Sequence, residues 1–254
     1  MTPPESIDPQ AGAFVSLQGV RKAFGAKQVL RDLSLEVRRG ETLVILGGSG
    51  SGKSVLLKHI NGLLRPDAGR VVVDGRDIAT SSEVELVSVR RKVGILFQSG
   101  ALFDSMTVGD NVAYGLREHS GLPEDTIAER VRATLAMVDL PDTESLMPAQ
   151  LSGGMRKRAA LARSIILEPA ALLYDEPTTG LDPVLAHRID LLIRRLQAQL
   201  QLTSVVVTHD LHSAFTVGDR FAFLHAGAIR FVGLRDELER TTDSLVAEFL
   251  KAAA

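Results

Sequence analysis

The chain has no cysteine, no long apolar run and no excess of one charge. Without cysteine, its 254 residues can form neither disulfides nor cysteine metal sites, which fits a reducing compartment. No apolar run approaches the roughly 18 residues that a membrane-spanning helix needs. A net charge of −2 argues against holding nucleic acid through bulk charge. Residues 1–13 lack an apolar signal core and predict a flexible tail. We therefore expect a partner to supply any link to a membrane.

The most specific motif is a phosphate-binding loop. Its pattern, G-x-x-x-x-G-K-[ST], is matched by Gly47-Gly48-Ser49-Gly50-Ser51-Gly52-Lys53-Ser54. An apolar run (42–46) precedes it and leucines at helical spacing follow, which disfavours the alternative of a Gly/Ser linker. Glycines let backbone N–H groups approach a polyphosphate, and the helix start adds partial positive charge. We expect Lys53 to reach the β- and γ-phosphates and the Ser54 hydroxyl to bind Mg²⁺.

Three kinds of apolar pattern predict an α/β fold. Residues 33–38 alternate as a half-buried antiparallel strand does, and 71–73 lead into an Asp74-Gly75 turn of the same layer. The runs 43–46, 170–174 and 204–207 are short and continuous, as in parallel strands buried on both faces. Between 98 and 167 the pattern is helical, and residues 236–251 predict a further helical segment. The economical interpretation is an α/β core with a helical insertion.

A pair of carboxylates ends one of the buried runs. Asp175 is expected to support Mg²⁺ through a water, and Glu176 to act as general base on the attacking water. By itself the pair is also compatible with a plain acidic turn. Together with the phosphate loop it indicates a nucleotide-hydrolysing enzyme.

The motif that discriminates among ATPases is Leu151-Ser152-Gly153-Gly154-Met155. It resembles the signature of the ATP-binding-cassette (ABC) family. The resemblance implies a P-loop NTPase (RecA-like) core, an antiparallel β layer and a helical signature subdomain, within one ABC ATPase domain over 14–254. It also implies a homodimer that sandwiches ATP, where Ser152, Gly153 and Gly154 meet the partner's γ-phosphate. The alternative is an ordinary serine N-cap before a glycine pair.

Other positions match the family one by one. Gln98 stands where the family places a glutamine that contacts Mg²⁺ and water, although a glutamine after a strand is often only surface. His209 matches the γ-phosphate histidine. Asp182 matches the loop that crosses the dimer interface, and it also suits a helix N-cap before Pro183. Phe24 stands where an aromatic stacks on adenine, against the alternative of a core aromatic. Val55 replaces the commoner threonine after the loop.

The stretch after Gln98 narrows the resemblance. Residues 98–108, 110–114 and 116–119, together with Met155, are similar to ATPase subunits of MCE-type phospholipid transporters, the Mla group. This implies phospholipid transport between bacterial membranes, from the cytoplasmic face of the inner membrane. The implied partners are a permease docking near residues 99–119, an MCE-domain lipid-binding protein and a STAS-type subunit. Because the chain stops at Ala254, a STAS contact that needs a longer tail is not expected here.

The alternatives to phospholipid transport are a small-solute importer, such as one for amino acids, or a non-transport ABC ATPase acting on DNA or ribosomes. The low net charge disfavours the latter, and we expect no nucleic-acid partner.

The roles of two groups of side chains remain open. Leu102, Phe103 and Met106 are either anchors for a permease helix or core of the helical region. The basic run 156–158 is compatible with a solvated helix face.

Overall fold

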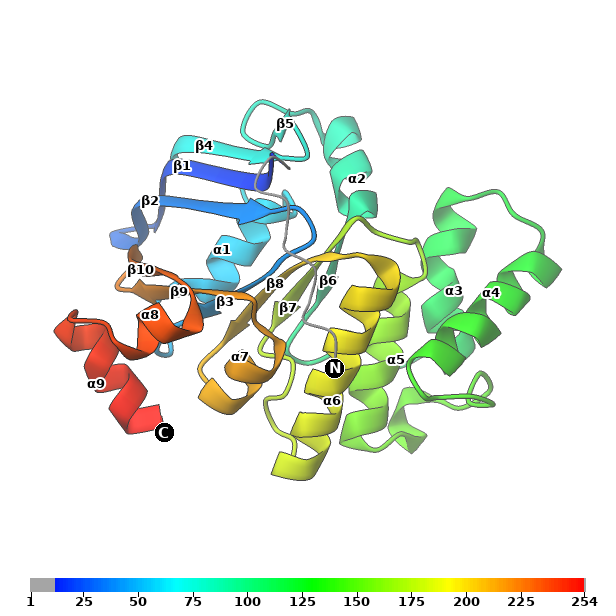
Figure 1. The fold of residues 1–254 in the computed structure, drawn as a ribbon. Helices are drawn as coiled ribbons and strands as arrows, with labels where there is room; N and C mark the ends of the chain where they lie inside the picture. The colour runs from blue at the N-terminus through cyan, green and yellow to red at the C-terminus, as the bar shows by residue number, and fades with distance from the viewer. Residues whose placement is uncertain (1–11, 254) are drawn as a thin grey trace.

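Two β-sheets frame the computed structural model, which describes residues 12–253 (Figure 1). The larger sheet has six strands in the order β10-β9-β3-β8-β7-β6, parallel except where β10 pairs with β9. Its strands are β3 (Thr42–Leu46), β6 (Val93–Leu96), β7 (Ala171–Asp175), β8 (Thr203–Thr208), β9 (Arg220–His225) and β10 (Ala228–Gly233).

The three central strands of this sheet are buried along their whole length, as their continuous apolar runs predicted. Alternate side chains of one strand enter different cores. Val44 and Leu46 belong to the core shared with the helices of 108–217, whereas Leu43 and Ile45 belong to the core shared with the antiparallel sheet. Because side chains alternate along a strand, a sheet covered on both faces needs apolar residues at every position.

The smaller sheet is antiparallel, in the order β2-β1-β4-β5. Its strands are β1 (Ala13–Phe24), β2 (Lys27–Arg38), β4 (Ala68–Val73) and β5 (Arg76–Asp77). The predicted alternation is confirmed, since Leu33, Leu35 and Val37 are buried and the residues between them are exposed. Asp74 and Gly75 have φ of 49° and 78°, the left-handed values of a tight hairpin turn.

Helices cover both faces of the parallel sheet. Their bounds are α1 (Lys53–Ile60), α2 (Glu83–Lys92), α3 (Val108–His119), α4 (Glu124–Met137), α5 (Gly153–Ile165), α6 (Pro183–Leu200), α7 (Leu211–Val217), α8 (Arg235–Glu239) and α9 (Ser244–Ala253), with a 3₁₀ turn at Pro148–Gln150. The apolar sides of α1 and α2 pack in the core of the antiparallel sheet, and those of α3 to α7 in the other core. Figure 1 shows α3 and α4 on the side of α5 away from the antiparallel sheet.

Polar side chains set where several helices begin. Ser82 forms a capping box with Glu85, and Thr107 accepts a hydrogen bond from the Asp110 N–H. Asp182 accepts from the N–H groups of Val184 and Leu185, both at 3.0 Å, which confirms its N-cap interpretation.

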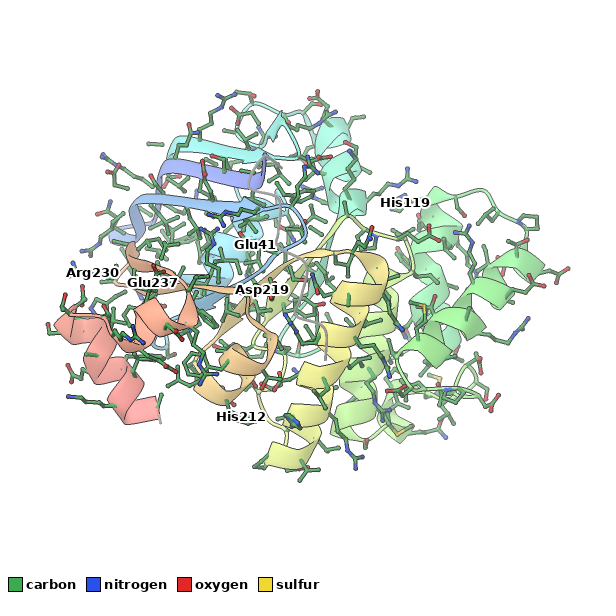
Figure 2. The ribbon with its side chains drawn as sticks, in the orientation of Figure 1. Glu41, His119, His212, Asp219, Arg230 and Glu237 are labelled. Carbon is green, nitrogen blue, oxygen red and sulfur yellow. The ribbon has the colours of Figure 1, made fainter. Side chains whose placement is uncertain are left out.

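A buried ion pair joins the starts of β3 and β9. Glu41 is 1% exposed, and its carboxylate accepts hydrogen bonds from the Arg220 guanidinium at 2.7 and 3.1 Å. Asp219 accepts from the Thr42 N–H at 2.8 Å, and Figure 2 labels Glu41 and Asp219 close together. The Arg220 guanidinium pairs the buried Glu41 carboxylate, and these contacts join the start of β9 to the start of β3.

The two ends of the chain differ from expectation in detail. Residues 1–11 of the expected tail lie outside the described part, and Ala13 already belongs to β1. The expected helical segment over 236–251 is divided, because α9 begins anew after Asp243, whose carboxylate accepts from the Leu245 and Val246 N–H groups. Within residues 12–253, no helix is both long and apolar enough to span a bilayer.

Candidate active site

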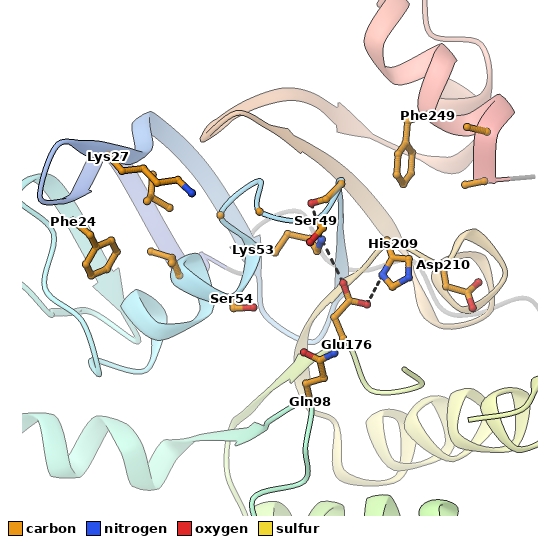
Figure 3. Close-up of a pocket in the computed structure, with 17 residues that line it drawn as sticks. Phe24, Lys27, Ser49, Lys53, Ser54, Gln98, Glu176, His209, Asp210 and Phe249 are labelled. Carbon is orange, nitrogen blue, oxygen red and sulfur yellow. Dashed lines mark hydrogen bonds and ion pairs between the residues drawn. The ribbon is translucent and has the colours of Figure 1, made fainter. Parts of the chain in front are cut away.

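A cleft of about 1070 Å³ lies where the phosphate loop meets the carboxyl ends of the parallel strands. Figure 3 shows Phe24 and Lys27 on one side of the loop, and His209 and Phe249 on the other. The lining residues are Phe24, Lys27, Val29, Gly48, Ser49, Gly50, Gly52, Lys53, Ser54, Val55, Gln98, Glu176, His209, Asp210, Phe249, Ala252 and Ala253.

Two glycines of the phosphate loop are required by geometry. A Cβ on Gly47 would lie 2.3 Å from the Leu224 carbonyl oxygen, so no larger residue fits. Gly52, which precedes α1, has φ of 112°, a conformation that side chains strongly disfavour. The loop therefore keeps its backbone close to the cleft and delivers Lys53 to the first turn of α1.

Lys53 is the first residue of α1, and its side chain folds back over the phosphate loop, where it is 7% exposed. Its ammonium donates hydrogen bonds to the carbonyl oxygens of Gly47 at 2.7 Å and Gly48 at 3.1 Å. It also lies 3.3 Å from Oε1 of Glu176. The strand end after β7 is thus paired electrostatically with the phosphate loop.

Ser54 and Asp175 bring two oxygen ligands together. The Ser54 hydroxyl donates to Oδ1 of Asp175 at 2.8 Å. Burial raises the pKa of Asp175, and the hydrogen bond from Ser54 opposes that shift. Within residues 12–253, no three His, Asp or Glu side chains converge as a metal cage. An oxygen pair of this kind fits Mg²⁺, which uses one or two carboxylates and completes its shell with phosphates and water.

Glu176 follows β7 directly and has a left-handed backbone, with φ of 49°. Its Oε2 lies 2.9 Å from Nδ1 of His209 and accepts a weaker hydrogen bond from the Thr179 hydroxyl at 3.4 Å. A non-glycine residue in this conformation costs free energy, and such residues cluster at functional sites. The carboxylate thus touches Lys53 on one side and His209 on the other (Figure 3).

Phe24 lines the cleft with 48% of its surface exposed, which excludes the core-aromatic alternative. Lys22 places its ammonium 5.6 Å from the ring centroid. Val55 also lines the cleft, from the first turn of α1. Gln98 lines the cleft from the segment after β6.

The signature residues form a second group. Of the residues that the structure describes, Ser152, Gly153, Gly154 and Asp182 lie outside the lining of the cleft. Ser152 is exposed, and it accepts from the Met155 N–H at 3.3 Å to start α5. A Cβ on Gly153 would lie 3.5 Å from Leu181, so the signature packs beside the Asp182 loop. Most residues selected from the sequence therefore line the cleft or form this separate surface. Gly47, Ser51 and Asp175 do neither, and belong to the phosphate loop and the end of β7.

Lys157 corrects the expectation of a solvated basic face. It is 7% exposed and donates a hydrogen bond to the Gln98 carbonyl oxygen. Burial lowers its pKa, and the nearby carboxylates of Asp175 and Glu176 oppose that shift. Helical spacing could have found it, because Gly154, Lys157 and Leu161 share one buried side of α5. No comparable pattern indicates Phe249, Ala252 and Ala253, which α9 brings to the cleft.

The segment after Gln98 is held to the surface by Asn111. This buried amide accepts from the Phe103 N–H at 2.7 Å and donates to the Phe103 carbonyl oxygen at 3.0 Å. Phe103 itself is 39% exposed, and its ring lies against the Arg163 guanidinium at 4.3 Å and the Tyr114 ring at 5.2 Å. Leu102 is half-buried and packs on the core, and Met106 is half-buried too. Of the three predicted anchors, Phe103 is the most accessible.

The fold and the cleft define a nucleotide-binding P-loop ATPase, and comparison with known proteins specifies its class. A family model described as "ABC transporter" matches residues 30–179. The chain is 42% identical over 239 residues to the "Probable ribonucleotide transport ATP-binding protein mkl" of Mycobacterium tuberculosis, covering 94% of this chain and 67% of that protein. It is 43% identical over 227 residues to the "Intermembrane phospholipid transport system ATP-binding protein MlaF" of Haemophilus influenzae, covering 89% and 86%. A solved dimeric ATP-binding cassette in a post-hydrolysis state, bound to ADP and Pi, superposes with a TM-score of 0.80 at 32% identity, covering 87% of this chain and 98% of that one. The chain belongs to the ABC transporter family and is an ATP-hydrolysing subunit.

Proposed function

We propose that this chain powers phospholipid transport between bacterial membranes by hydrolysing ATP in the Lys53–Glu176–His209 cleft. The observation that carries the hydrolytic part is the position of Glu176. One carboxylate lies 3.3 Å from the phosphate-loop lysine and 2.9 Å from His209, at the end of a buried strand. A base held between a phosphate anchor and a second polar group suits attack of water on a γ-phosphate.

Each polar group of the cleft has a role in this proposal. Lys53 and the loop N–H groups hold the β- and γ-phosphates, and Phe24 offers its exposed ring to adenine. Ser54 and Asp175, with Gln98, would hold Mg²⁺, which would neutralise negative charge on the phosphates. Glu176 accepts a proton from the attacking water. His209 orients Glu176 and contacts the γ-phosphate.

A second copy of the chain completes the site in this proposal. Ser152 at the start of α5 and the Asp182 loop lie together outside the cleft of their own chain. An exposed serine and glycine N–H groups at a helix start form an anion site that a partner's γ-phosphate can occupy. The similar solved cassettes are described as dimeric, which supports an ATP-sandwich homodimer.

The assignment of phospholipid as the cargo rests on the names of relatives and on one exposed surface of the chain. The Haemophilus relative is named for intermembrane phospholipid transport, and the exposed Phe103 region offers a docking place for a permease helix near residues 99–119. The permease would hold the chain at the cytoplasmic face of the inner membrane. An MCE-domain lipid-binding protein and a STAS-type subunit are the further partners we propose. Ribonucleotide transport is a second candidate, because the mycobacterial relative carries that name.

Purification with native membrane partners in mild detergent tests the cargo. We expect glycerophospholipid to be retained in the complex by mass spectrometry, and its ATPase activity to respond to phospholipid. The matched arms use ribonucleotides that the cleft does not hydrolyse, and amino acids. A lipid-free complex whose ATPase responds to one of these solutes would replace the phospholipid assignment.

A further inference from the structure

A buried carboxylate outside the catalytic cleft lies beneath the loop that follows Glu176. Asp190 on α6 is 1% exposed, and its Oδ2 accepts a hydrogen bond from the Ser213 hydroxyl on α7 at 2.8 Å. The Ser213 oxygen lies 3.2 Å from the Thr178 hydroxyl oxygen, two residues after Glu176. Thr178 and Ser213 are buried as well. We call Asp190, Ser213 and Thr178 the hydroxyl relay, because they connect α6 through α7 to the catalytic loop.

The relay reaches both partners of the Glu176–His209 contact. The Ser213 hydroxyl is hydrogen-bonded to Thr178 in the loop that carries Glu176. Through its N–H, Ser213 donates to Asp210 at 3.1 Å, which fixes the start of α7 directly after His209. The same serine therefore sets the two segments whose side chains meet at 2.9 Å in the cleft.

Asp190 is only partly satisfied. Its Oδ1 is buried and has no hydrogen-bond partner among residues 12–253. Burying an ionised carboxylate with a free oxygen is costly, and burial raises the pKa of Asp190 to about 6 despite the hydrogen bond from Ser213.

The charged and titratable groups around Asp190 lie on α6 and α7 or directly before α7. Asp210, before α7, raises its pKa further, and His212 on α7 lowers it. His212 lies between α7 and α6 in Figure 2, and its ring is 5.5 Å from that of His187 on α6. Further along α6, Arg194 is bonded to Asp219 at 2.8 Å. Opposing fields from Asp210 and His212 leave burial as the dominant influence on Asp190.

We propose that Asp190 is a positioning residue for ATP hydrolysis and that its protonation reverses the direction of the hydroxyl relay. When Asp190 is ionised, Ser213 must donate to it, so the Ser213 oxygen is free to accept from Thr178. When Asp190 is protonated, its O–H can donate to Ser213, which then donates to Thr178 and turns the threonine hydrogen away. Both arrangements keep the Thr178–Ser213 hydrogen bond, but the second leaves the Thr178 hydrogen without an acceptor among the hydrogen bonds of the described residues, which costs free energy at a buried position and loosens the Glu176 loop. The inference rests on the proposed role of Glu176.

The test is the pH dependence of steady-state ATP hydrolysis by the full chain between pH 5 and 8. For the unmodified chain we expect kcat to decline below about pH 6 while KM for MgATP stays constant, since the relay includes neither Lys53 nor any residue of the phosphate loop. Asp190→Asn keeps an acceptor for Ser213 but cannot ionise, so this step should disappear from its profile. Steps due to groups outside the relay should remain in both proteins.

Two serine variants separate positioning from general loss of packing. Ser213→Ala removes the central hydroxyl, and we expect kcat to fall about 2- to 10-fold at pH 7.5, the range that one hydrogen bond provides. Ser204→Ala is the matched control, because Ser204 is a buried serine on β8 that takes no part in the relay. It should leave kcat unchanged.

The outcomes distinguish the relay from the wider proposal. A pH profile of Asp190→Asn that is identical to that of the unmodified chain, or equal kcat values for the two serine variants, overturns the relay. Glu176→Gln is assayed in parallel. If that variant keeps full turnover, the role of Glu176 is wrong. If it is inactive while Asp190→Asn leaves the pH profile unaltered, only the relay is wrong.

Discussion

The proposed permease surface can be tested at Phe103, because the structure gives the cost of changing it. The ring is 39% exposed and makes two special contacts, one with Arg163 at 4.3 Å and one with Tyr114 at 5.2 Å. The first contributes about 0.5–1 kcal/mol and the second about 0.5–1.5 kcal/mol. Loss of these two contacts therefore costs about 1–2.5 kcal/mol, and the new carboxylate beside the Arg163 guanidinium offsets part of the loss of apolar burial that accompanies it. For a chain of this size the melting temperature should fall by less than about 10 °C.

Permease binding should suffer far more than folding. An apolar anchor at the centre of an interface contributes about 2 kcal/mol or more, so Phe103→Glu should weaken permease binding by about 30-fold or more. Co-purification with the cognate permease and a thermal melt are the two measurements. Val84→Glu is the matched control, because it adds the same charge at a position that is 82% exposed on α2. Normal permease binding by a folded Phe103→Glu would refute the docking surface. A melting drop well beyond 10 °C would show that the ring acts as core.

Four further changes follow from the site. Glu176→Gln should lower turnover by about 10² to 10⁴ and accumulate as an ATP-bound dimer in size-exclusion chromatography; full turnover would remove it as general base. Lys53→Ala removes the ammonium that meets two loop carbonyls and Glu176, so calorimetry should show loss of MgATP binding, and unchanged affinity would contradict its role. Ser152→Arg, in the Glu176→Gln background, should keep ATP binding by the monomer yet prevent dimerisation; a persisting dimer would exclude the composite site. Asp190→Asn should become progressively more stable than the unmodified chain from about pH 4 to pH 6. Since the pKa of Asp190 is about 6 in the fold against 3.8 ordinarily, its ionisation costs the folded state on the order of 3 kcal/mol at neutral pH, and denaturant unfolding that gave a pH-independent difference would contradict this.

Local chemistry made much of the cleft predictable. The phosphate loop combines glycines, a lysine and serines within one short segment, and it lies between a continuous apolar run and leucines at helical spacing. The same holds for Asp175 and Glu176, since a continuous apolar run must end at the edge of a buried sheet. The parallel and antiparallel layers were predictable because strands covered on both faces differ in pattern from strands covered on one. These inferences need only neighbours in the chain.

Tertiary packing decided what depends on segments far apart. Lys157 is buried because the segment after β6 lies over α5, and α9 reaches the cleft because β9 and β10 carry the chain back beside the phosphate loop. The hydroxyl relay joins Thr178, Asp190 and Ser213, which no periodicity relates. From sequence Asp190 is an ordinary helical carboxylate. Its burial between α6 and α7 is the main cause of its raised pKa and places it beneath the catalytic loop. Desolvation and hydrogen-bond partners are properties of the packed chain, which no local pattern reveals.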